Sequence, residues 1–156
     1  MIDDYRKDAA DRLKEDLPPL PLTAKQTAEL ITLLKSPNIK DPEILMDLFC
    51  HRIPSGVDQA AYIKAAYLTD VAKGIEISSL ISPKFAVELL GTMVGGYNVQ
   101  SLISLLDSEL ADDVVKVLSH IILIFDAFHD VSEKVKSGNK AAMKVMESWA
   151  NGDWFF

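Results

Sequence analysis

The stretch Glu88-Leu-Leu-Gly-Thr-Met-Val-Gly-Gly-Tyr-Asn98 joins two helical apolar patterns through a glycine-rich turn. Gly95 and Gly96 can adopt a positive φ without steric penalty from a Cβ atom, so one helix can end there and the chain can turn sharply. Asn98 is expected to cap the following helix by accepting hydrogen bonds from its first free amides. The stretch therefore predicts a corner between two helices.

Helix signals recur along the rest of the chain, and the alternating pattern of strands is nearly absent. Residues that can cap a helix precede apolar stripes at Thr23 (with Gln26 at capping-box spacing), Asp41, Asp58 and Ser82. The stripe after Asp58 is expected to bury Tyr62, Ala65, Ala66, Thr69 and Ala72. Residues 110–128 are apolar on nearly all sides and predict one central buried helix, and a last helix is expected over 139–149. These signals predict an all-α fold.

The domain organisation follows from the same signals. Residues 1–22 read as a charged surface helix and a stiff proline-rich connector, and residues 23–156 as a helical stack within a single domain, 1–156. Helix pairs joined by short turns fit both a stack of antiparallel hairpins and a compact bundle. The pattern alone leaves these two architectures open.

Composition narrows the classes of function. The net charge of −7 disfavours a general nucleic-acid surface. Cys50 is the only cysteine, which excludes an intrachain disulfide and fits the reducing cytoplasm. We expect no secretion signal near the N-terminus and no membrane partner, because the longest apolar run, 121–125, is far too short to span a bilayer.

Three groups of residues could carry chemistry. Asp126, His129 and Asp130 lie within one helical turn and could share a divalent metal, although a solvated helix end fits them better. Cys50 and His51 are neighbours that point about 100° apart on a helix, which favours a small buried thiol beside a surface imidazole. His120 is expected to be a hydrogen-bonded core histidine. We therefore predict no catalytic, metal-binding or cofactor-binding residue in the chain.

Two other features point to contact with a partner. Lys136, Lys140 and Lys144 would form one basic stripe if a helix ran through Gly138, although a solvated face is the default interpretation. An interface is predicted at four aromatic residues near the C-terminus, with closure of the domain's own core as the alternative: Trp149, Trp154, Phe155 and Phe156. The glycine corner is not a phosphate loop, because it follows a helix and lacks the Gly-Lys-Ser/Thr ending.

The corner stretch resembles the N-terminal HEAT-like helical domain of bacterial aconitase B, the bifunctional aconitate hydratase 2 and 2-methylisocitrate dehydratase. The same resemblance is carried, in the same order along the chain, by Tyr5-Arg6-Lys7, Arg52–Ala65, Leu118-Ser-His120, Phe125-Asp126, Asp130-Val131, Gly138-Asn139, Val145-Met146 and Ser148–Phe155. It spans nearly the whole chain and favours a HEAT-like stack over a bundle.

The resemblance implies a role without chemistry for this chain. In the family this domain resembles a protein-interaction module that contributes to self-association and walls the passage to the active site. The parent enzyme interconverts citrate and isocitrate through cis-aconitate with a [4Fe-4S] cluster, whose ligands lie in catalytic domains that no residue here matches. The implied partners are those remaining domains and a second copy in a homodimer. The alternatives are a free-standing helical interaction domain, a small metal-dependent enzyme built on Asp126, His129 and Asp130, and an RNA-binding module, which the acidic charge disfavours.

Overall fold

The computed structural model describes residues 2–121 and 125–152, and these residues form helices and connections without a strand. The helices, in chain order, are α1 (Ile2–Leu13), α2 (Ala24–Leu34), α3 (Pro42–His51), α4 (Gln59–Ala72), α5 (Pro83–Gly91), α6 (Val99–Leu105), α7 (Ala111–Leu118), α8 (Phe125–Lys136) and α9 (Lys140–Ala150). The all-α prediction is confirmed. None of the described helices is long and apolar enough to cross a membrane.

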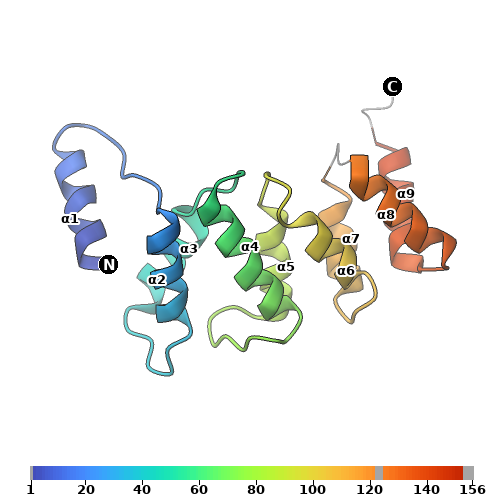
Figure 1. Cartoon of the computed structure of the whole chain (residues 1–156), viewed down its shortest axis with the longest axis horizontal. Coiled ribbons are helices and arrows are strands. Elements are labelled where there is room, and N and C mark those ends of the chain that lie inside the picture. The colour runs from blue at the N-terminus through green and yellow to red at the C-terminus, as the bar shows by residue number, and fades with distance from the viewer. Residues whose placement is uncertain (1, 122–124, 153–156) are drawn as a thin grey trace.

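The helices form a row of hairpins, with each hairpin packed on its neighbours (Figure 1). Helices α2 and α3, α4 and α5, α6 and α7, and α8 and α9 pair in sequence. Between hairpins, α2 packs on α4 and α6 on α8, while α5 packs on α7 and α7 on α9. The arrangement is a stack of hairpins, the first of the two architectures that the sequence left open.

Most of the predicted capping residues start their helices as expected. Thr23 and Gln26 form a complete capping box, and the side chains of Asp58 and Ser82 accept from backbone amides in the first turns of α4 and α5. Asp41 is different, because its φ of 52° is left-handed and its side chain makes no capping hydrogen bond. The start of α3 therefore depends on Pro42, whose fixed φ suits the first helical position.

The single helix expected over residues 110–128 is wrong. Helix α7 ends at Leu118, and α8 begins at Phe125. The indole Nε1 of Trp149 donates to the carbonyl oxygen of Leu118 at 2.9 Å. A continuing helix would use this carbonyl for the amide four residues later. The same carbonyl accepts from the amide of Ile121, three residues on, at 3.1 Å, so the chain tightens there and the indole of α9 is the second donor at the point where the helix stops.

Helix α4 buries a wider surface than the predicted stripe. It packs on both α2 and α5, so side chains on two of its sides are covered. Tyr62 and Ala66, which the pattern placed in the core, are exposed, whereas Tyr67 and Leu68 are buried. Alanines allow this close packing on two sides because they add little bulk.

Helix α1 lies apart from the row, at its N-terminal end (Figure 1). No residue of α1 is buried, as expected for a surface helix. Its side chains bond to the connector that follows: the hydroxyl of Tyr5 donates to the carbonyl oxygen of Leu20 at 3.2 Å, and Nε of Arg12 donates to that of Pro18 at 2.8 Å. These two hydrogen bonds hold α1 against the proline-rich connector.

A polar node joins the last two hairpins. Asp107, in the connection after α6, pairs with Lys134 of α8. Asn139 caps α9 through its Oδ1 atom, while its Nδ2 atom donates to the carbonyl oxygen of Leu106 at 3.0 Å and to Asp107 at 2.6 Å. Hydrogen bonds from Lys134 and Asn139 hold the pKa of Asp107 below its usual value of 3.8.

Replacing Asp107 by Asn is expected to lower the free energy of unfolding at pH 7. A carboxylate with a depressed folded-state pKa stabilises the protein above its unfolded-state pKa, and this contribution is lost as the pH falls through the folded-state pKa, which lies below 3.8. The difference between wild type and Asp107→Asn should therefore shrink in acid. Urea unfolding at pH 7 and near pH 2 measures it. Asp112→Asn, at an exposed surface pair with Lys144, is the control and should change little at either pH. A difference for Asp107→Asn that is the same at both pH values would contradict the prediction.

Candidate functional site

The glycine corner packs directly against the connection between α3 and α4. A Cβ atom added to Gly95 would lie 1.8 Å from the carbonyl oxygen of Gly56, a distance that no side chain tolerates. Gly96 has a φ of +88°, in the left-handed region that favours glycine. The predicted sharp turn is therefore present, and Gly95 has a second role that the sequence did not show, which is to let two backbones meet.

Hydrogen bonds and a ring contact join the same two segments. The amide of Val94 donates to the carbonyl oxygen of Ser55 at 2.9 Å. The hydroxyl of Tyr97 donates to the carbonyl oxygen of Val57, also at 2.9 Å. The rings of Tyr62 and Tyr97 meet edge to face, with centroids 5.4 Å apart. We call residues 53–57, Tyr62 and residues 92–97 the upper edge, because both connections lie along the top of the row of helices in Figure 1.

Asn98 does not cap α6, and this prediction is wrong. Its backbone is helical rather than extended, and its side chain makes no capping hydrogen bond. Instead, Nδ2 of Asn98 donates to the carbonyl oxygens of Leu90 at 2.7 Å and Met93 at 3.1 Å. Asn98 therefore stabilises the turn that follows α5, because Leu90 lies in the last turn of that helix and Met93 lies just beyond its end. Its side chain is buried, and its Oδ1 atom has no hydrogen-bond partner within residues 2–121 and 125–152.

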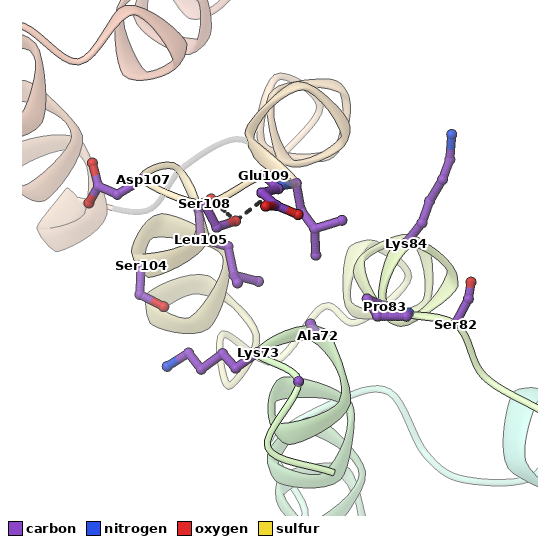
Figure 2. Close-up of a pocket in the computed structure, with 12 residues that line it drawn as sticks. Ala72, Lys73, Ser82, Pro83, Lys84, Ser104, Leu105, Asp107, Ser108 and Glu109 are labelled. Carbon is purple, nitrogen blue, oxygen red and sulfur yellow. Dashed lines mark hydrogen bonds between the residues drawn. The ribbon is translucent and has the colours of Figure 1, made fainter. Parts of the chain in front are cut away.

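A groove of about 790 Å³ lies on the opposite side of the row, where α4 ends, α5 begins and α6 turns into α7 (Figure 2). Ala72, Pro83 and Leu105 surround its centre, while the charged ends of Lys84 and Asp107 extend away from it. Lys84 pairs with Asp113 at 3.3 Å, and Asp107 pairs with Lys134. The centre of the groove is thus apolar, and two of its four charged lining residues, Lys84 and Asp107, are engaged elsewhere; the other two are Lys73 and Glu109. An apolar centre suits packing better than acid–base chemistry.

The proposed metal ligands are not brought together among the described atoms. Asp130 accepts from Nε2 of Gln100 at 2.6 Å, a contact between α8 and α6, and His129 is exposed. The side chain of Asp126 lies outside the described part of the structure. Within that part, no group of three or more His, Cys, Asp or Glu residues could hold a metal ion.

Cys50 and His51 end α3 with the thiol half-buried and the imidazole exposed, the arrangement that helical geometry favours. Burial raises the pKa of the Cys50 thiol, which disfavours the reactive thiolate.

Lys64 of α4, which sequence reasoning missed, is 2% exposed, and its Nζ lies 5.2 Å from the centroid of the Phe49 ring. Burial lowers the pKa of Lys64. The sequence signal that could have indicated this burial is the position of Lys64 among the alanines of α4, most of which are buried.

His120 is exposed, so the prediction of a core histidine is wrong, although its Nδ1 atom lies 2.7 Å from the carbonyl oxygen of Lys116. The residue falls in the turn that ends α7 rather than inside a long buried helix. The burial expected from that helix is therefore missing.

No helix runs through Gly138, whose φ is +90°, so the three lysines do not form one helical stripe. Lys136 lies on α8 and pairs with Glu133, whereas Lys140 and Lys144 lie on α9, where Lys144 pairs with Asp112.

Trp149 is 8% exposed and stacks on Phe128 with ring centroids 6.3 Å apart. It therefore contributes to the chain's own core and offers little surface to a partner. The other predicted aromatic contacts, Trp154, Phe155 and Phe156, lie outside the described residues.

Comparison of the sequence with known proteins identifies its family. The family model described as the aconitate B N-terminal domain matches residues 4–155. The chain belongs to this family. It is 51% identical over 156 residues to aconitate hydratase B of Salmonella typhimurium and of Escherichia coli, and 38% identical over 161 residues to that of Helicobacter pylori. Each match covers 99% of this chain but only 18% of the relative.

Gly95→Ala is expected to destabilise the protein by roughly 3 kcal/mol or more, because the added methyl group would collide with backbone atoms that cannot rotate away. Gly138→Ala is the matched control: it also disturbs a turn between helices, but its φ of +90° lies beside open space, so only the conformational penalty of about 1–2 kcal/mol applies. Urea unfolding followed by circular dichroism measures both changes. Equal losses for the two variants would show that the close approach at Gly95 is not tight in solution.

Proposed function

We propose that this chain forms the N-terminal part of an aconitate hydratase and acts there as a packing and interaction module. The observation that carries the proposal is the match of nearly the whole chain to proteins named aconitate hydratase B, of which it spans 18%. The proposed parent interconverts citrate and isocitrate through cis-aconitate. The chemistry would then belong to the part of the parent that this chain does not span.

The residues of this chain do not fit the iron–sulfur cluster that such an enzyme uses. Clusters of this type are held by several cysteine thiolates. The chain has one cysteine, Cys50, and burial raises the pKa of its thiol. We therefore assign the cluster, with its ligands, to the remaining domains of the proposed parent. The lone thiol also suits the cytoplasm as the compartment of that parent.

The shape of the stack supports a role in binding other chains or domains. A row of hairpins has two long edges made of connections, and each hairpin packs mainly on its neighbours, which leaves extended surfaces for other chains or domains. The proposed role comprises walling the passage to the active site and contributing to self-association. For self-association the candidate contacts remain Trp154, Phe155 and Phe156, together with Lys140, which is exposed on α9.

Activity assays on two proteins test the proposal. The full-length gene product, loaded with iron and sulfide, is expected to convert citrate to isocitrate, and the 156-residue chain treated in the same way is expected to show no turnover, because it lacks the thiolates for a cluster. Sedimentation velocity on the same samples reports self-association. Turnover by the isolated chain, or a cluster-loaded full-length protein without hydratase activity, would contradict the assignment. A chain and a parent that both stay monomeric at all concentrations would remove the self-association part.

A further inference from the structure

We propose that the upper edge docks onto a neutral, apolar surface of the remaining domains of the parent polypeptide. The docking side chains are Val57, Tyr62, Val94 and Tyr97, which come from two neighbouring connections and from the start of α4. The inference rests on the proposed function, because its occupant is the rest of the parent enzyme. It goes beyond that function by naming the surface of the stack that makes the contact.

The four side chains are exposed although they are apolar or aromatic. Their exposed fractions are 76% for Val57, 80% for Val94, 52% for Tyr62 and 39% for Tyr97. Tyr62 and Tyr97 touch each other, Tyr97 bonds to the carbonyl oxygen of Val57, and the amide of Val94 bonds to Ser55, so the four residues lie on two segments that are joined into one group. Single exposed apolar residues are ordinary, but a contiguous group that includes two tyrosines is typical of a contact surface.

The group is held in place before any partner arrives. The close approach of Gly95 to Gly56 and the hydrogen bond from Val94 to Ser55 fix the two connections to each other. A surface that is already ordered loses little conformational entropy on binding. The backbone interactions that hold the corner therefore also prepare its side chains for contact.

The surroundings of the group indicate an uncharged occupant. One quarter of the chain's residues are charged, yet residues 89–106 and 53–57 contain no Asp, Glu, Lys or Arg. The nearest acidic residue, Asp58, is engaged as the cap of α4. Depletion of charge is a property of the buried centre of interfaces. A neutral, apolar partner surface matches this patch.

The size of the patch favours an attached domain over a second copy. Its four side chains expose on the order of 400 Å². A stable complex of separate molecules buries about 800 Å² on each partner. A domain linked through the same polypeptide needs less area, because the linker holds it at a high effective concentration. The upper edge is thus large enough for contact within one chain and small for a dimer interface of its own.

Hydroxyl-radical footprinting of the isolated chain and of the full-length protein tests the inference. Labelling of Tyr62 and Tyr97 is expected to fall several-fold in the full-length protein. Val94→Asp in the full-length protein should restore that labelling, because it places a charge in the apolar contact. Ile77→Asp is the matched control: Ile77 is 90% exposed in the connection between α4 and α5, on the other side of the row, and its replacement should leave the labelling low.

The outcomes separate the two proposals. An active full-length hydratase in which both tyrosines label as in the isolated chain would overturn the docking surface and leave the proposed function standing. A restoring effect of Ile77→Asp equal to that of Val94→Asp would also overturn it. Concentration-dependent protection of the tyrosines in the isolated chain would assign the surface to a second copy and contradict the inference. A full-length protein without hydratase activity would count against the proposed function, and its footprint would still report whether the edge is covered.

Discussion

The close approach of two backbones at Gly56 and Gly95 sets the geometry of the central part of this protein. One segment links the first hairpin to the second, and the other links the second to the third. Because a Cβ atom at position 95 would lie 1.8 Å from the Gly56 carbonyl oxygen, the contact exists only with glycine at that position. The hydrogen bonds from Val94 and Tyr97 then join the two connections, so consecutive hairpins are fastened at their ends as well as along their helices.

Similar polar contacts join the third hairpin to the fourth. Asn139 and Lys134 hold Asp107 between the third hairpin and the fourth, and Trp149 bonds to the carbonyl that ends α7. In a row of hairpins each unit contacts mainly its neighbours, so stability is approximately a sum of local units and the interfaces between them. Polar contacts at the hairpin ends therefore set the register of one unit on the next, while apolar side chains supply the bulk of the burial.

The sequence predicts those features that depend on local chemistry. The capping box at Thr23 and the cap at Asp58 follow from hydrogen bonds within one turn, and the glycine corner follows from backbone freedom. The wrong predictions each involve a contact outside the helix that was expected. Asn98 has the composition of an N-cap but serves the preceding helix.

The other wrong predictions have the same origin. The helix expected over 110–128 is interrupted where Trp149, 31 residues from Leu118, takes a backbone acceptor, and His120 becomes exposed with that interruption. Tyr62 leaves the predicted core for an exposed contact with Tyr97, and the meeting of Gly56 with Gly95 likewise joins residues far apart in the chain. Periodicity records one helix at a time and carries no information on such contacts.

The amide hydrogen of Val94 gives the most direct test of the central claim, that the corner and the α3–α4 connection form one closed unit. Val94 lies in a surface connection and its side chain is 80% exposed, yet its amide donates to Ser55 across the contact. Native-state hydrogen exchange is expected to show this amide protected to nearly the same free energy as core amides of α5, because exchange would require the two connections to separate. Exchange as fast as that of the Ile77 amide, in the exposed α4–α5 connection, would contradict the account.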